Sequence, residues 1–280
     1  MTPLVSPQWL NSHLSEDKLI LLDASMDKVV GKAPIVYETP TYIPNSLKLD
    51  LAGSFCNTQS DELHALPTQA QFEAACRDLG IVQDSLVVIY DNQGVYSAPR
   101  AWWTFKIMGF ARVFVLDGGL PQWQREGYAV MDQLATPVTL PSNSQLLLSP
   151  NPTLVCDAEY VLQRLHQEEV AILDARSAQR FTGTAPEPRP GVRSGHIPGS
   201  LNLPFTQVLD GYKLKSQGEL NQLFHGLTLE DKQVICSCGS GITACILLLA
   251  AEVAGVKTKR LYDGSWADWG SKGHLPVETD

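Results

Sequence analysis

Four segments of this sequence recur in a second copy, in the same order along the chain. The matched segments are 21–24 with 172–175, 42–49 with 196–203, 86–91 with 233–238, and 115–123 with 261–269. The copies are separated by between 146 and 154 residues. Four matches in constant order indicate a duplicated domain. A chain of 280 residues is long enough for two such domains, each with its own core.

The join between the copies is predicted where the composition shifts. Residues 131–153 are rich in Pro, Ser, Asn and Thr and show no sustained hydrophobic period. Such a stretch is typical of an extended connection. We therefore expect a first domain over residues 1–132, a linker over 133–152 and a second domain over 153–280.

Each copy alternates short apolar segments with longer helical ones. The expected strands are 19–22, 86–90, 113–116, 170–174 and 233–237, and the expected helices are 68–79, 98–109, 157–167 and 243–254. This alternation predicts an α/β fold with a mainly parallel sheet in each copy. Ligands of such sheets bind at the carboxyl ends of the strands. Asp91 and Cys238 are then expected at equivalent strand ends, one in each copy.

Charge and composition exclude several classes of partner. The net charge is -9 and the pI is near 5.1, so no nucleic-acid or anionic-membrane partner is expected. No apolar run is long enough for a membrane span, and the first residues lack a signal-peptide pattern. Six cysteines without a secretory signal do not suggest a disulfide framework. We expect a cytoplasmic protein whose thiols stay reduced.

The loop Cys238-Gly-Ser-Gly-Ile-Thr243 joins an apolar strand to an apolar helix. A loop entering a helix N-terminus presents backbone N–H groups and the positive end of the helix dipole. Gly239 and Gly241 allow successive amides to converge on one anion, and Ser240 and Thr243 add hydroxyl donors. The loop could therefore stabilise a cysteine thiolate, which is the nucleophilic form. The alternative is a glycine-rich turn with an incidental thiol.

The spacing of residues in this loop excludes three other kinds of site. A cysteine phosphatase needs an arginine six positions after its cysteine, where this chain has Ala244. A phosphate-binding P-loop needs a lysine that is missing here, and no paired Cys/His spacing indicates a metal. Cys236 and Cys245 are predicted to be small buried residues. No metal and no cofactor are expected.

The duplicated halves, the segment His196-Ile-Pro-Gly-Ser200 and the loop 238–243 resemble the two-domain rhodanese-type sulfurtransferases. The form Cys-Gly-Ser-Gly-Ile-Thr is similar to the 3-mercaptopyruvate branch of that family. The resemblance implies two tandem rhodanese-like domains, each a mainly parallel five-stranded sheet flanked by helices. Asp91 stands where the first copy would carry its own cysteine, which resembles the inactive N-terminal domain of the family.

The resemblance also implies the residues that bind substrate. Arg180-Phe-Thr-Gly-Thr-Ala-Pro-Glu-Pro-Arg189 is similar to a family element whose two arginines hold the substrate carboxylate. Arg180 and Arg189 are therefore expected to bind substrate, together with Gly239, Gly241 and Ile242 of the loop. Cys238, Ser240 and Thr243 are expected to be catalytic.

A Ser-His-Asp relay is a weaker part of the resemblance. Ser240 matches the serine, and His64 resembles the histidine. The sequence departs at the acidic member, because Ala52 follows Asp50-Leu51 where relatives often carry an acid. Asp61 is near in sequence and could substitute. His196 and the tryptophans at 102, 103, 123, 266 and 269 are expected to be structural.

The implied reaction moves sulfur from 3-mercaptopyruvate through a Cys238 persulfide to a thiol, thioredoxin or cyanide, with release of pyruvate. Two alternatives stay open. One is a thiosulfate sulfurtransferase, although enzymes of that kind typically carry basic residues where this loop has Gly239 and Ser240. The other is a non-catalytic rhodanese-like module that binds proteins or senses redox state through an exposed cysteine.

Overall fold

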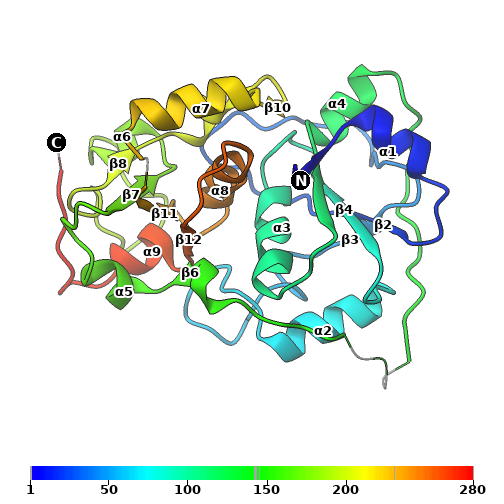
Figure 1. Cartoon of the computed structure of the whole chain (residues 1–280), viewed down its shortest axis with the longest axis horizontal. Coiled ribbons are helices and arrows are strands. Elements are labelled where there is room, and N and C mark those ends of the chain that lie inside the picture. The colour runs from blue at the N-terminus through cyan, green and yellow to red at the C-terminus, as the bar shows by residue number, and fades with distance from the viewer. Residues whose placement is uncertain (1, 142–143, 145, 230, 280) are drawn as a thin grey trace. The chain divides into compact units, whose positions relative to one another are not determined.

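The computed structural model of the chain describes residues 2–141, 144, 146–229 and 231–279 (Figure 1). The chain forms two compact units. The first comprises Met1–Thr58, Leu66–Asn151 and Asp210–Leu214. The second comprises Gln59–Ala65, Pro152–Leu209 and Lys215–Asp280. Each unit therefore contains a short segment from the sequence of the other half.

The first unit is built on a five-stranded sheet with the order β1-β5-β4-β2-β3. The strand pairs are parallel. The elements are β1 (Leu4–Val5), α1 (Pro7–His13), β2 (Leu19–Asp23), β3 (Leu47–Lys48), α2 (Gln69–Asp78), β4 (Leu86–Tyr90), α3 (Ala98–Ile107), β5 (Val113–Leu116) and α4 (Gly119–Arg125). Helix α2 begins with a capping box, in which Thr68 and Gln71 each bind the other's backbone N–H.

The second unit repeats this architecture, with the sheet order β6-β12-β11-β7-β8 and parallel pairing. Its elements are η1 (Pro152–Leu154), β6 (Val155–Cys156), α5 (Ala158–Leu162), β7 (Val170–Asp174), α6 (Ala178–Phe181), β8 (Leu201–Asn202), η2 (Phe205–Val208), α7 (Gln217–Gly226), β11 (Gln233–Ser237), α8 (Ala244–Val253), β12 (Lys259–Tyr262) and α9 (Ser265–Trp269). β9 (Leu209–Asp210) and β10 (Lys213–Leu214) form a separate pair. The predicted fold, two parallel five-stranded sheets flanked by helices, is confirmed.

Equivalent side chains make equivalent bonds in the two units. The indole N–H of Trp123 donates to the carbonyl of Ala129 at 2.8 Å, and that of Trp269 donates to the carbonyl of Pro276 at 2.7 Å. Ser46 and Ser200 each donate to the carbonyl three residues earlier. The repeated motifs thus mark positions where a buried polar group needs a fixed partner.

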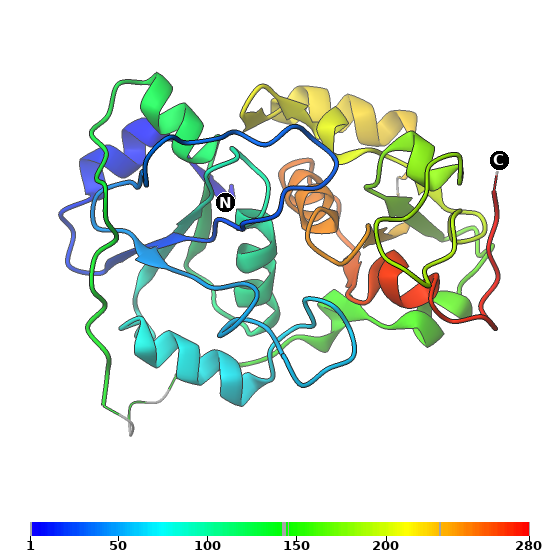
Figure 2. The same cartoon turned by 180° about the vertical axis from the view of Figure 1, so that it is seen from behind.

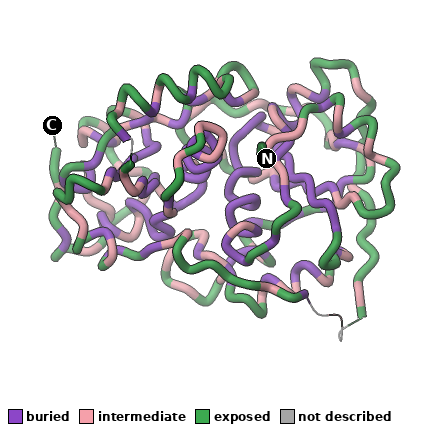
Figure 3. The backbone as a smooth tube through the Cα atoms, viewed as in Figure 1, coloured by how far each residue is buried: buried purple, intermediate pink, exposed green. Residues whose placement is uncertain are grey.

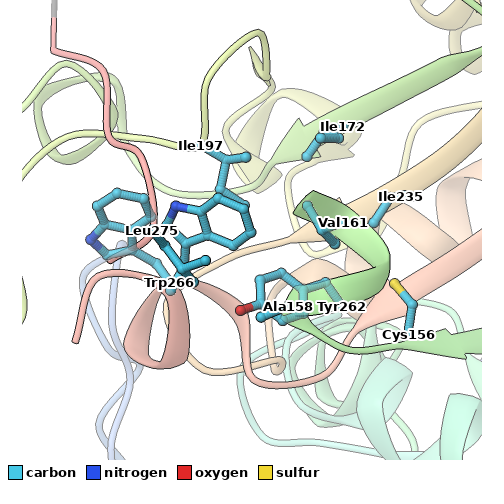
Figure 4. Packing of buried hydrophobic residues seen from close by; sticks show 10 residues of the cluster. Cys156, Ala158, Val161, Ile172, Ile197, Ile235, Tyr262, Trp266 and Leu275 are labelled. Atoms are coloured by element: carbon cyan, nitrogen blue, oxygen red, sulfur yellow. The ribbon is translucent and has the colours of Figure 1, made fainter. Parts of the chain in front are cut away.

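Helices cover both faces of each sheet, as the views from the two sides show (Figures 1 and 2). In the second unit, α8 contacts β11 and β12. On the other face, Trp266 of α9 and Val161 of α5 pack with Ile172 and Ile235 (Figure 4). The central strands of both units are buried (Figure 3). Burial on both faces explains why these strands read as continuous apolar runs.

Helix α5 is shorter than the predicted helix over 157–167. It ends at Leu162, where the next backbone bonds become shorter-range: the N–H of Arg164 donates to the carbonyl of Val161 and that of Leu165 to the carbonyl of Leu162. His166 then has φ +62°, a left-handed value. These tighter turns end the helix before the predicted residue.

The segment expected to be a linker, 133–152, is bonded along the first unit as far as Asn151. The N–H groups of Ala135 and Leu140 donate to the carbonyls of Ser46 and Arg77, each at 2.9 Å. Residues 142, 143 and 145 of that segment lie outside the described residues. Among the helices that the structure describes, none has the length and apolarity needed to cross a membrane.

Candidate active site

Cys238 follows β11, the strand that pairs with β7 on one side and β12 on the other. Its N–H donates to Ser265 Oγ at 3.1 Å, and its carbonyl accepts the N–H of Trp266 at 2.9 Å. The carbonyl of Gly239 accepts the N–H of Ala267, also at 2.9 Å. The backbone after β11 is therefore held by the first residues of α9. Ser265 has φ +51°, a strained value for a residue other than glycine.

The equivalent loop of the first unit is filled by its own carboxylate. Asp91 follows β4 and is completely buried. Its Oδ2 accepts the N–H groups of Tyr96, Ser97 and Ala98 at 2.8–2.9 Å, and its Oδ1 accepts that of Gln93 at 2.9 Å. Burial raises the pKa of the Asp91 carboxyl, and these four bonds oppose the rise because they stabilise the ionised form. A strand-to-helix loop of this chain thus already surrounds an anion with backbone N–H groups.

The surroundings of Cys238 are buried and partly polar. Cys238 is 1% exposed, and Ser265 Oγ lies 4.0 Å from its Sγ. The redox-sensing alternative assumes an exposed Cys238, whereas the structure shows that Cys238 is buried. Ser240 and Ile242 are also buried. Thr243 is the N-cap residue of α8, and no hydrogen bond from its side chain caps the helix.

The two glycines of this loop, Gly239 and Gly241, are favoured for different structural reasons. A Cβ atom at Gly239 would lie 3.1 Å from Arg180 Nη2, closer than nine in ten real Cβ contacts. The Arg180 guanidinium therefore lies directly against the residue that follows Cys238. Gly241 has φ +79°, a left-handed backbone that favours glycine.

Arg180 is held by Glu187. Nε donates to Oε1 at 3.0 Å and Nη2 donates to Oε2 at 2.6 Å, a bidentate pair. The carboxylate therefore occupies one edge of the guanidinium. Nη2 and Nη1 are the atoms nearest to a Cβ at Gly239, so the other edge faces the Cys238 loop.

Glu187 is bound in turn by a second, fully buried arginine. Arg176 Nη1 donates to Glu187 Oε1 at 2.9 Å. Its Nε and Nη2 donate to Asp174, and Nη2 also donates to the carbonyl of Gly195 at 2.8 Å. The Arg176 guanidinium lies over the Trp266 ring at 4.5 Å. Alternating charges thus form a continuous chain from the end of β7 to Arg180.

Arg189 lies within electrostatic range of the same groups. Burial lowers the pKa of its guanidinium, and the positive charge of Arg180 lowers it further. Cys238 and Glu187 act in the opposite direction on the pKa of Arg189. Of the two arginines expected to bind substrate, Arg180 lies beside the Cys238 loop, and Arg189 interacts electrostatically with Arg180, Cys238 and Glu187.

His64 belongs to the segment Gln59–Ala65, which is part of the second unit. Its Nδ1 lies 3.1 Å from Ser240 Oγ, within hydrogen-bonding distance. Asp50 lies in the first unit, where its carboxylate accepts the N–H of Ala52 at 2.9 Å. Asp61 is exposed. The serine and histidine of the expected relay meet, while its acidic member is not identified by these positions.

The remaining candidates are structural in position. Cys236 and Cys245 are fully buried, and burial raises the pKa of Cys236 well above its usual range. His196 stacks on Phe181 with ring centroids 3.8 Å apart, and its Nδ1 lies 2.9 Å from the Phe181 carbonyl. The tryptophans at 102, 103, 123, 266 and 269 are at most 1% exposed.

A cavity of about 440 Å³ lies elsewhere in the second unit. Phe224, Leu229, Lys232 and Val256 are among its lining residues. It is located beside the starts of β11 and β12, whereas Cys238 follows the end of β11. We assign this cavity no part in the chemistry at Cys238.

Sequence reasoning missed Arg176, Glu187 and Ser265. Glu187 lies inside the Pro-Glu-Pro-Arg element that pointed to Arg189, and Arg176 directly follows a repeated segment. Ser265 is aligned by the repeat with Gly119, and both have φ near +50°. A comparison of the copies residue by residue would have singled out Ser265 as a turn position.

Comparisons with known proteins agree with this architecture. The family model described as the rhodanese-like domain matches residues 6–126 and again 157–272. The chain belongs to the rhodanese family. It is 37% identical to "3-mercaptopyruvate sulfurtransferase" of Escherichia coli K12, over 99% of this chain and 98% of the relative. It is also 37% identical to mitochondrial "Thiosulfate/3-mercaptopyruvate sulfurtransferase 1" of Arabidopsis thaliana, over 99% and 78% of the two chains.

A solved structure of similar architecture is that of the Tum1 protein from Saccharomyces cerevisiae. The match has a TM-score of 0.85 at 30% identity and covers 99% of this chain and 98% of the yeast chain. With two rhodanese domains and curated sulfurtransferase relatives over its whole length, this rhodanese-family chain is a sulfurtransferase. The predicted family and enzyme class are confirmed.

Proposed function

We propose that this chain is a 3-mercaptopyruvate sulfurtransferase that carries sulfur as a persulfide on Cys238. The observation that carries the proposal is the contact of the Arg180 guanidinium with the residue after Cys238. A planar guanidinium is suited to a carboxylate, and mercaptopyruvate brings a carboxylate two bonds from the carbon that bears its sulfur. The names of the bacterial and plant relatives support the choice of donor.

In the first half-reaction, the Cys238 thiolate attacks the sulfur of mercaptopyruvate. A sulfur–sulfur bond forms and the carbon–sulfur bond breaks. The electron pair of the broken bond passes to the methylene carbon, which gives the enolate of pyruvate. Protonation of that carbon releases pyruvate and leaves a Cys238 persulfide. Arg180 and Arg189 hold the donor carboxylate through this step, and no cofactor takes part.

The loop residues have separate roles in this scheme. We expect the backbone N–H groups from Gly239 through Gly241 and Ile242 to stabilise the sulfur anion, by analogy with the N–H groups that bind the Asp91 carboxylate in the first unit. Thr243 adds a hydroxyl at the start of α8. We assign Ser240 and His64, 3.1 Å apart, to the protonation of the enolate carbon.

In the second half-reaction, an acceptor attacks the outer sulfur of the persulfide. The acceptor is a thiolate, reduced thioredoxin or cyanide. The electron pair of the sulfur–sulfur bond returns to Cys238, which is ready for the next donor. Because the enzyme is modified between the two substrates, ping-pong kinetics are expected.

Donor preference tests the proposal. We expect a higher kcat/KM with mercaptopyruvate than with thiosulfate, by about tenfold or more. Arg180 and Arg189 suit the planar carboxylate of mercaptopyruvate, and Gly239 and Ser240 add no further cation for the thiosulfate dianion. The measurement is steady-state turnover with each donor and cyanide as acceptor. A higher kcat/KM with thiosulfate would replace the proposed function by a thiosulfate sulfurtransferase.

The two arginines are predicted to act in one half-reaction only. Arg180→Ala and Arg189→Ala should each lower the rate of persulfide formation from mercaptopyruvate by about tenfold to a thousandfold, because a charge-assisted contact to the carboxylate is lost. Isolated persulfide should still discharge into a thiol at the wild-type rate. Intact mass follows both steps, since the persulfide adds one sulfur atom. Equal losses in both half-reactions would contradict the carboxylate-binding role.

A further inference from the structure

Arg180 is the last member of a chain of ion-paired side chains that is buried in the second unit. Four side chains alternate in sign: Asp174, Arg176, Glu187 and Arg180. The first three side chains are at most 3% exposed, and that of Arg180 is 14% exposed. Arg180, beside the Cys238 loop, therefore has the most exposed side chain of the four.

We propose that Glu187, fixed by Arg176, is a positioning residue that aims the Arg180 guanidinium at the donor carboxylate. This inference rests on the proposed function and adds a residue to it. Glu187 touches neither the sulfur nor the donor in this arrangement. It acts by holding one edge of Arg180, so that the other edge is presented beside Gly239.

The bond between Glu187 and one edge of the Arg180 guanidinium is expected to affect donor binding. A free arginine side chain has many rotamers, and fixing it on substrate binding costs conformational entropy. The bidentate bond from Glu187 fixes both the position and the plane of the guanidinium before the donor arrives. Displacements of about 1 Å in positioning groups lower rates by about a hundredfold. Pre-organisation by Glu187 is thus expected to favour donor binding and attack.

Arg176 holds Glu187 by a hydrogen bond from Nη1 to Oε1. It spans the Asp174 carboxylate, the Gly195 carbonyl and the Glu187 carboxylate at once. Asp174 is the last residue of β7, which pairs with β11 along its whole length. The sheet therefore sets the place of Arg180 relative to Cys238 through fixed side chains.

The test compares Glu187→Gln with wild type in the two half-reactions. The rate of persulfide formation is measured by intact mass across mercaptopyruvate concentrations, and discharge is measured by adding excess thiol to isolated persulfide. We expect the half-saturating mercaptopyruvate concentration to rise by about tenfold to a hundredfold, with discharge within about twofold of wild type. A substitution that only weakened the fold would change both half-reactions.

A double-mutant cycle shows whether Glu187 acts through Arg180. In the background of Arg180→Lys, which cannot form the bidentate pair, Glu187→Gln should change persulfide formation by less than about twofold. Multiplicative losses in the double variant would overturn the proposal. Arg176→Lys keeps the charge but not the geometry that spans both carboxylates. It should raise the half-saturating concentration as well, and it carries the test if Glu187→Gln does not fold.

Glu252→Gln is the matched control. Glu252 pairs with Lys259 at 2.7 Å in the same unit, beside the start of β12 and not beside Cys238. The same chemical change there should leave the half-saturating mercaptopyruvate concentration unchanged. If wild type gains no sulfur from mercaptopyruvate, the proposed function fails. If wild type gains sulfur and Glu187→Gln has an unchanged half-saturating concentration, only the positioning role fails.

Discussion

Cys238→Ser is expected to abolish sulfur uptake while the fold is retained. A hydroxyl has the shape of the thiol, but it is a far weaker nucleophile at neutral pH and forms no persulfide. Turnover of mercaptopyruvate should fall by roughly three orders of magnitude or more, as is usual when a covalent nucleophile is removed. Intact mass after exposure to mercaptopyruvate should show one added sulfur atom on wild type and none on the variant.

Cys156→Ser is the control for this experiment. Cys156 is a second buried thiol of the same unit, and its Sγ lies 3.5 Å from the carbonyl of Leu261, to which a serine hydroxyl can also donate. This variant should take up sulfur at the wild-type rate. Sulfur uptake that persists in Cys238→Ser would assign the nucleophile to another thiol and would end the proposed mechanism.

Asp91→Ala is expected to destabilise the first unit by about 3–5 kcal/mol, at the upper end for a single substitution. The substitution removes the acceptor of four buried N–H groups, and no side chain of the loop replaces it. Release of a desolvated carboxylate offsets part of the loss, since burial raises the pKa of Asp91. Asp91→Asn should lose less, because its amide oxygen can still accept at the place of Oδ2.

Hydrogen exchange resolves this effect by unit, which whole-chain unfolding does not do in a two-domain protein. Faster exchange should be confined to the strands and helices of the first unit. The control is Asp27→Ala, the same change at an exposed position, which should shift stability by less than about 0.5 kcal/mol. An Asp91→Ala loss no larger than that of the control would show that the four N–H groups find other acceptors.

The fold could be predicted because the same order of strands and turns occurs in both copies of the repeat. Buried strand 86–90 is apolar at every position, and strand 233–237 has an apolar centre, Val234-Ile235-Cys236. Turn residues follow both strands, so the order of the elements is visible in both copies. The end of α5 could not be predicted in this way. Local backbone bonding after Leu162 decides it, and the residues 163–167 remain compatible with a helix. The domain boundaries stay predictions.

The candidate site was predictable for residues to which the family resemblance gives a role, and not for the residues that hold them in place. The contacts between Arg180 and Gly239 and between His64 and Ser240 agree in position with the expected site, while their roles remain predictions. Arg176 and Glu187 show no signal as a pair, because they are eleven residues apart in sequence and meet only through the fold. A buried charge chain of this kind is a tertiary property.

The carboxylate enclosed at the end of β4 gives the molecule a built-in reference. The loop after β4 always holds its own carboxylate, whereas under the proposed function the loop after β11 gains and loses one sulfur atom in each cycle. Amide chemical shifts near Asp91 therefore supply an internal standard, recorded in the same tube, against which each stage of sulfur loading after β11 can be read.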